Sequence, residues 1–241
     1  MLELEAQTAA YSGQLNQARD LSQRAIDSAM RARKKDTAAN FEASAALREA
    51  LFGNIAEGRL YAKLALRLST GKRAQYGTAL ALALAGDEAQ AQALADDLGR
   101  RLPDDTSVQF NYLPTIRAQI ALSHRDASSA TQLLRTAAPY ELGNVGYASL
   151  GPIYVRGEAY LAEHRGVESA GEFQRVVDHR AIVQFAPIEA LAYLQLGRAY
   201  AMSGDKDKAK SAYQDFLSIW KDADSVIPIL KQAKAEYSKL Q

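Results

Sequence analysis

The chain of 241 residues has no cysteine, which excludes disulfide bonds, thiolate metal sites and a cysteine nucleophile. It has only six prolines and few β-branched runs, whereas alanine and leucine are abundant, and this composition favours helix over strand. The longest apolar run, 79–85, is far shorter than the roughly 18 residues that a membrane helix needs. The first five residues include two glutamates and no basic side chain, where a signal peptide would be basic. We therefore expect an all-α chain with no membrane contact and no signal peptide.

An excess of charge of one sign is also missing. The chain carries 29 basic and 28 acidic residues, so its net charge is +1. Nucleic-acid binding draws much of its affinity from the neutralisation of phosphates by basic side chains. A balance this even predicts no direct contact with nucleic acid.

Residues 188–223 contain two helical patterns separated by a break. In the first pattern, small and apolar residues lie three and four positions apart, on one face of a helix. Gly204 follows, a residue that can take the left-handed conformation that ends a helix. The second pattern runs from Ala209 to Trp220 with the same spacing. Gly197 and Ala209 are small where the two helices would cross, so we predict a tightly packed helical hairpin.

The same pattern recurs along the whole chain. Small residues stand at equivalent places in six segments, namely Ala6, Ala46, Ala79, Ala118, Gly157 and Gly197. They predict hairpins at about 2–33, 37–68, 73–102, 108–138, 150–180 and 187–222. Residues 225–240 carry one further apolar stripe, expected to be a helix that covers the end of the array, with Asp224 or Ser225 as its N-cap and Trp220 buried between it and the last hairpin. The glycines and prolines of 139–152 predict a loop. Because one hairpin cannot bury both its faces, we expect a single domain, 1–241, built as a right-handed α-solenoid.

The spacing Leu196-Gly197-x-x-Tyr200, followed by Ala209 and Tyr213, resembles the tetratricopeptide repeat. In that family the first helices of the pairs line a concave groove that binds a protein or peptide. The resemblance assigns eight side chains to such a groove: Arg73, Tyr76, Tyr112, Gln119, Tyr154, Glu158, Leu194 and Arg198. The alternative is that these side chains pack against neighbouring helices.

Two short matches to catalytic motifs do not hold. His124-Arg125-Asp126 equals the triplet of a kinase catalytic loop, but the required Asn is replaced by Thr131. Near Gly71, a phosphate-binding loop would need a glycine at position 66, which is leucine. The three histidines have no metal-ligand spacing. We therefore predict no catalytic residue, no metal site and no cofactor.

Longer segments of the sequence resemble one particular family of repeat-containing proteins. The segments 108–122, 137–143, 154–161, 213–217 and 220–224 are similar to the C-terminal tetratricopeptide-like region of bacterial, commonly acidobacterial, eukaryotic-like serine/threonine kinases. In those proteins a kinase domain, and usually a membrane helix, precedes the repeats.

The resemblance implies a non-catalytic sensor or scaffold region with a protein or peptide partner. It leaves the compartment open, the extracytoplasmic part of a membrane-anchored protein being one alternative. A self-associating module that forms a homodimer, and the repeat region of a winged-helix transcriptional regulator, are the other functions left open.

Overall fold

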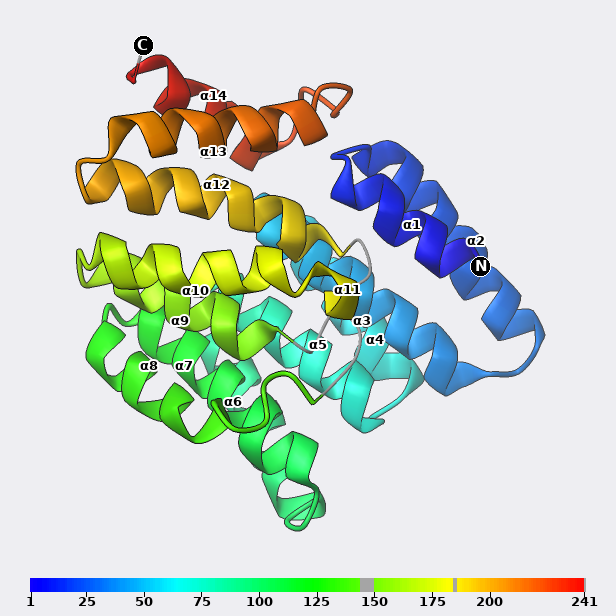
Figure 1. The fold of residues 1–241 in the computed structure, drawn as a ribbon. Helices are drawn as coiled ribbons and strands as arrows, with labels where there is room; N and C mark the ends of the chain where they lie inside the picture. The colour runs from blue at the N-terminus through cyan, green and yellow to red at the C-terminus, as the bar shows by residue number, and fades with distance from the viewer. Residues whose placement is uncertain (144–149, 184–185, 241) are drawn as a thin grey trace.

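A computed structural model describes residues 1–143, 150–183 and 186–240. Throughout these residues the secondary structure is helical, with no strand. Figure 1 shows antiparallel helix pairs stacked side by side in sequence order. The predicted all-α solenoid of helical hairpins is therefore confirmed. Part of the predicted loop at 139–152, residues 144–149, lies outside the described residues.

Six hairpins make up the stack. The first three pair α1 (Leu2–Tyr11) with α2 (Leu15–Arg31), α3 (Lys35–Phe52) with α4 (Ile55–Leu68), and α5 (Lys72–Leu84) with α6 (Glu88–Arg101). A π-helical turn (Val108–Tyr112) leads into α7 (Leu113–Ser123), which pairs with α8 (Ala127–Leu134) and the 3-10 turn Arg135–Ala137. The last two pair α9 (Gly151–Ala162) with α10 (Gly166–Asp178) and α12 (Pro187–Met202) with α13 (Lys206–Ile219), before α14 (Pro228–Ser238). The short α11 (Arg180–Val183) lies between them.

Residues in the left-handed conformation end the first helix of each pair. Gly204 has a φ of 83°, which confirms the predicted turn. At the equivalent turn between α7 and α8 the residue is Arg125, with a φ of 62°. The His-Arg-Asp triplet thus belongs to a helix–helix turn, where Asp126 accepts a hydrogen bond from the backbone N–H of Ser129 at 3.0 Å. Asp126 acts as the N-cap of α8.

The crossings within the hairpins use the predicted small residues. A Cβ on Gly197 would lie 2.7 Å from the ring of Tyr213, and a Cβ on Gly157 would lie 2.7 Å from the ring of Phe173. Real Cβ atoms do not approach other atoms so closely, so each ring occupies the space that a larger residue would need. The predicted close crossing of α12 and α13 at Gly197 is confirmed.

The helices form two rows that differ in burial. The first helices of the pairs, α1, α3, α5, α7, α9 and α12, make the inner row, in which consecutive helices from α3 to α12 contact each other. The second helices, α2, α4, α6, α8, α10 and α13, make the outer row. In α12, 11 of 16 residues are buried, against 4 of 14 in α13. α13 therefore carries one apolar stripe, while α12 is enclosed on most sides.

The stack closes on itself, which the sequence does not predict. α1 packs against α12, and α14 packs against α3. The indole Nε1 of Trp220 donates to the carbonyl of Tyr11 at 2.9 Å, and Trp220 meets the Phe52 ring edge-on at 5.0 Å between centroids. Trp220 thus joins the last hairpin to the first two.

Asp224 completes this closure. Its carboxylate accepts from the backbone N–H of Asn16 at 2.8 Å and from the Asn16 amide at 3.1 Å. It therefore caps the N-terminus of α2, 208 residues away in sequence. The prediction that Asp224 or Ser225 caps the last helix is wrong, because the N-cap of α14 is Ile227, and α14 has no side-chain cap hydrogen bond.

Candidate functional site

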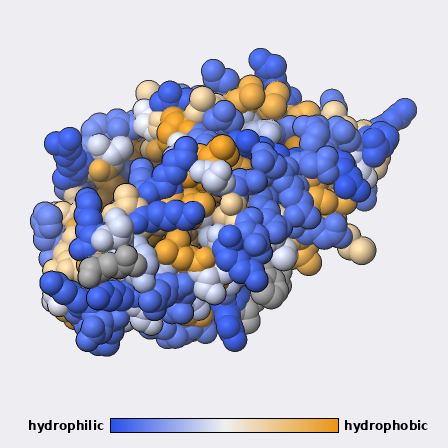
Figure 2. Space-filling model, turned by 90° about the horizontal axis from the view of Figure 1, so that it is seen from above, coloured by the Kyte–Doolittle hydropathy of each residue, from blue (hydrophilic) through white to orange (hydrophobic). Residues whose placement is uncertain are grey.

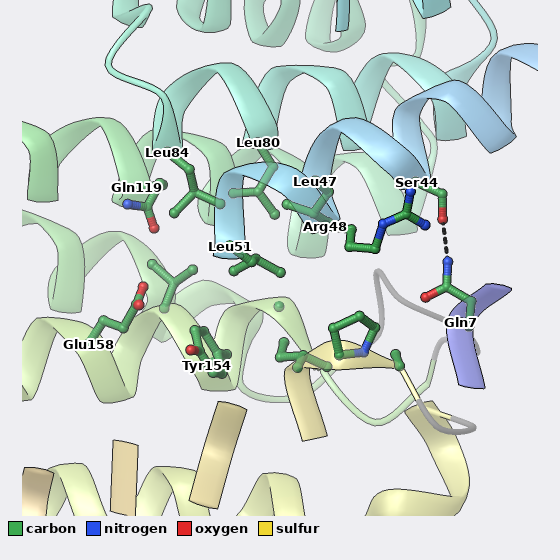
Figure 3. Close-up of a pocket in the computed structure, with 15 residues that line it drawn as sticks. Gln7, Ser44, Leu47, Arg48, Leu51, Leu80, Leu84, Gln119, Tyr154 and Glu158 are labelled. Carbon is green, nitrogen blue, oxygen red and sulfur yellow. Dashed lines mark hydrogen bonds between the residues drawn. The ribbon is translucent and has the colours of Figure 1, made fainter. Parts of the chain in front are cut away.

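A cavity lies between the inner-row helices, where α3 and α5 face α9 (Figure 3). The cavity volume is about 40 Å³, which is room for a few water molecules. With the mouth that opens to solvent, the unfilled space is about 540 Å³. Its middle is apolar, lined by Leu47, Leu51, Leu80, Leu84, Val155 and Ile188. Polar side chains gather at its two ends.

Arg48 marks one end, beside Gln7 and Ser44 (Figure 3). The arginine is only 2% exposed, and its Nη1 donates to Ser22 at 3.0 Å. Its Nε and Nη2 have no hydrogen-bond partner. Nη2 lies 3.9 Å from the Glu49 carboxylate, but both Glu49 oxygens already accept from Arg19 at 2.8 Å. Burial lowers the pKa of the Arg48 guanidinium, against the opposing effect of nearby carboxylates.

Glu158, Gln119 and Tyr154 mark the other end (Figure 3). Gln195 donates to the Tyr154 hydroxyl at 3.1 Å and to Glu158 at 3.3 Å. Burial raises the pKa of Glu158 to about 7, although Arg198 acts in the opposite direction. The buried amide oxygen of Gln119 has no partner. This end presents hydrogen-bond acceptors to the cavity.

Only three of the eight predicted groove residues line this cavity: Gln119, Tyr154 and Glu158. The ring of Tyr76 stacks on that of Tyr112 at 4.1 Å between centroids, and both are buried. Leu194 is fully buried, and Arg198 makes a two-pronged ion pair with Glu236 of α14 at 2.9 Å. Arg73 lies at the exposed start of α5.

An open groove lined by all eight side chains is therefore wrong. Because the stack curls until inner helices touch, Tyr76, Tyr112 and Leu194 pack against neighbouring helices, as in the alternative interpretation. Sequence reasoning also missed most of the residues that line the cavity, among them Leu47, Arg48, Leu51, Leu80 and Leu84. One signal was present: the apolar run 79–85 indicates a helix that is buried on several faces.

A second, open groove runs along the outside of α12, between α10 and α13. It holds about 320 Å³ and is lined by Gln174, Val177, Tyr193, Leu196, Tyr200, Lys208, Ser211, Ala212 and Asp215. Tyr193 and Tyr200 are half-buried, and Lys208 lies 5.5 Å above the Tyr200 ring. A neighbouring hollow shares Gln174, Tyr200 and Lys208 and extends the groove toward Val167. This groove combines aromatic rings with a polar rim, a pattern typical of protein-binding surfaces.

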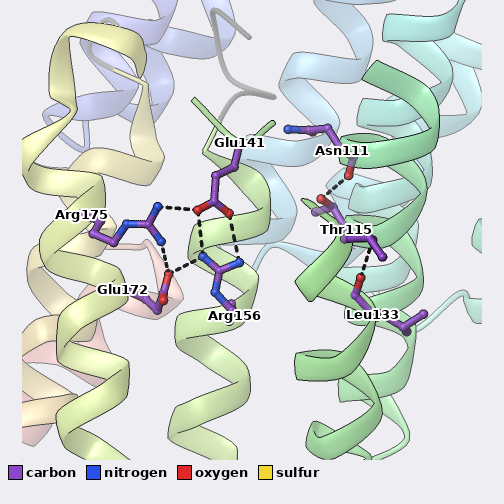
Figure 4. A network of polar contacts seen from close by, with 8 residues as sticks. Asn111, Thr115, Leu133, Glu141, Arg156, Glu172 and Arg175 are labelled. Atoms are coloured by element: carbon purple, nitrogen blue, oxygen red, sulfur yellow. Dashed lines mark hydrogen bonds and ion pairs between the residues drawn. The ribbon is translucent and has the colours of Figure 1, made fainter. Parts of the chain in front are cut away.

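A buried ion network fixes the segment after α8 (Figure 4). Arg156 of α9 donates to both oxygens of Glu141, at 3.0 and 3.2 Å, and to Glu172 at 2.6 Å. Arg175 contacts the same two carboxylates. Burial lowers the pKa of Arg156, but the hydrogen bonds of Glu172 and Glu141 outweigh it, so the pKa is raised overall. The network pairs its charges internally and serves the fold.

No protein-family model matches the sequence, and no curated protein matches it. Across the described ranges, no three His, Cys, Asp or Glu side chains are grouped so that they could hold a metal ion. None of the helices described is both long and apolar enough to cross a membrane.

Proposed function

We propose that this chain is a non-catalytic recognition module of the tetratricopeptide-like class, which binds an extended segment of a partner protein in the groove outside α12. The observation that carries this proposal is the accessibility of the groove. On the concave side, where such modules are expected to bind, the described residues enclose the inner cavity of about 40 Å³, whereas the groove beside Tyr193 and Tyr200 is open and holds about 320 Å³. Tyrosine side chains at interfaces contribute large contact areas at low entropic cost.

The dimensions of the groove suit a peptide segment. Tyr193 and Tyr200 are seven residues apart, which corresponds to about 10.5 Å along the axis of α12. An extended chain covers about 3.3 Å per residue, so roughly four residues would reach both rings. Gln174, Ser211 and Asp215 on the flanking helices offer polar groups to the backbone of such a segment.

The closure of the stack supports partner binding over self-association. A homodimer through the ends of the array would need exposed apolar helix faces at those ends. Here α1 packs against α12 and α14 against α3, so the ends cover each other. Figure 2 shows the face that lies on top in Figure 1, where apolar areas are separated by hydrophilic side chains. Single exposed apolar residues of this kind do not require an oligomer.

The kinase-like resemblance suggests what the module serves. We infer that it is the sensor or scaffold region of a bacterial serine/threonine kinase, where partner binding would regulate an attached catalytic domain. The similarity of the segments between residues 108 and 224 to that family supports this assignment. The chain itself should show no phosphoryl transfer from ATP, which a radiolabel assay would check.

Site-specific photocrosslinking tests the proposed groove. A photoreactive residue at position 200 should capture a discrete partner in the native host, and the same residue at Val226, exposed by 61%, should not. A synthetic peptide with the captured sequence should then bind the isolated chain, and Tyr200→Ser should weaken this binding about tenfold or more. Equal capture at both positions, or a peptide affinity that Tyr200→Ser leaves unchanged, would refute the groove.

A further inference from the structure

We propose that the inner cavity is a separate binding site for a small carboxylate with a slim apolar tail, such as a medium-chain acyl carboxylate. The carboxylate would bind to Arg48, and the tail would lie along the leucines of α3 and α5. This site is independent of the proposed groove outside α12.

Arg48 offers a carboxylate the Nε–Nη2 edge of its guanidinium. Two other arginines of this chain use the same edge to bind a carboxylate. Arg19 uses Nε and the Nη2 group to hold Glu49, and Arg198 uses the same pair to hold Glu236. In Arg48 both of these nitrogens are buried and make no hydrogen bond, although Nη2 lies 3.9 Å from the Glu49 carboxylate. Two parallel N–H donors on one edge match the two oxygens of a carboxylate. Leaving such donors unpaired in the interior is unfavourable, so a ligand that pairs them gains affinity.

The wall next to Arg48 determines the rest of the ligand. Leu47, Leu80, Leu51 and Leu84 lie between Arg48 and the far end of the cavity (Figure 3). Leu51 and Leu84 are only half-buried, so part of this apolar surface is open to solvent at the mouth. An alkyl chain that covers it would remove apolar area from water.

The two ends of the cavity fix the orientation of the ligand. At the far end, the oxygens of Gln119 and Glu158 would repel a second carboxylate, since both are acceptors or negatively charged. At the near end, Glu3 is the other acidic group that acts on Arg48. One Glu3 oxygen accepts from Gln7 at 2.8 Å and the other is buried without a partner. Burial raises the pKa of Glu3, which reduces its competition with the ligand for Arg48.

Calorimetric titration with three eight-carbon probes tests the site: octanoate, 1-octanol and octylammonium. Octanoate should bind the intact chain saturably and raise its melting temperature. 1-Octanol should bind about tenfold more weakly or worse, because it lacks the charge-assisted pair, and octylammonium, whose charge suits the Glu158 end, should bind Arg48→Met no worse than the intact chain. Arg48→Met should remove the preference for octanoate. Arg117→Met, which changes an arginine paired with Asp96 outside the cavity, should leave it intact.

A second variant keeps the test decisive if Arg48→Met does not fold. Leu84→Phe fills the middle of the cavity, retains Arg48 and should abolish octanoate binding. The proposal is overturned if octanoate and 1-octanol bind equally, if Arg48→Met keeps the preference, or if octanoate does not bind saturably at millimolar concentration. Tyr200→Ser should not affect octanoate, so failure of this site and failure of the groove outside α12 are distinguishable.

Discussion

Two arginines are buried on inner helices and are held in opposite ways. Arg156, in the C-terminal half, is 7% exposed and pairs with Glu141 and Glu172. Arg48, in the N-terminal half, is 2% exposed, yet a single hydrogen bond to Ser22 is its best contact. A buried charge normally needs a hydrogen-bonded partner. The same architecture therefore uses one arginine to build the fold and keeps the other beside a cavity, with two of its donors making no hydrogen bond.

The contrast between Arg48 and Arg156 depends on a closed interior, so the largest effect is expected from substitutions that disrupt that interior. Tyr76→Ala combined with Tyr154→Ala should leave the chain largely unfolded. Both rings are buried: Tyr76 stacks on Tyr112, and Tyr154 meets Phe173 edge-on. Each truncation to alanine costs about 3–5 kcal/mol. Their sum approaches the whole stability of a domain. Circular dichroism would check this. An unchanged melting temperature would show that both tyrosines line an open groove and are not part of the core.

The comparison itself is tested by paired arginine substitutions. Arg156→Met should lower the free energy of unfolding by about 3 kcal/mol, since it removes the cation that Glu141 and Glu172 share and leaves them only the more exposed Arg175. Arg48→Met should cost about 1 kcal/mol or less, because the burial penalty of its charge disappears together with one hydrogen bond. Urea denaturation measures both. Equal losses would mean that Arg48 is paired as completely as Arg156, and the contrast would be lost.

The two halves also differ in how their hairpins cross. In the last two hairpins an aromatic ring of the outer helix packs on a glycine of the inner helix. In the second hairpin the glycine, Gly58, is instead on the outer helix, and a Cβ there would lie 3.3 Å from the Ala46 carbonyl oxygen. Gly197→Val should therefore cost about 1–3 kcal/mol through overpacking against Tyr213. Gly171→Ala, with open space around the added Cβ, should instead stabilise α10 by about 0.5–1 kcal/mol. Thermal melts of both variants should shift in opposite directions, and a loss in both would point to a general intolerance of α10 and α12.

Local pattern predicted the hairpins, but not the interior they enclose. Small residues such as Gly197, and turns such as Gly204, act through neighbours within about 20 residues, so their spacing is visible in the sequence. The contact of Trp220 with Tyr11 depends on the summed curvature of six hairpins, which no single repeat encodes. The same curvature turned Tyr76 inward. Arg48 stands in an alanine-rich helix, and its sequence neighbours do not reveal that Arg19 has already taken Glu49.

The carboxylate at the far end of the cavity provides the smallest test, through pH. Burial raises the pKa of Glu158 from its ordinary 4.5 to about 7. Between these values the folded chain binds more protons than the unfolded chain, so this group makes stability fall as pH rises from about 4.5 to 7. Glu158→Gln should remove about 1–2 kcal/mol of that fall, after allowance for partial exposure.

Glu42 is the matched control for this prediction, because burial also raises its pKa to about 7, but it does not line the cavity. Glu42→Gln should flatten the stability profile to a similar extent. Only Glu158→Gln should also alter octanoate binding at the site of Arg48, and only slightly, since the carboxylate of the ligand lies at the opposite end. If Glu158→Gln leaves the pH dependence of the free energy of unfolding unchanged, Glu158 is already solvated. The cavity would then be open to solvent at the Glu158 end as well.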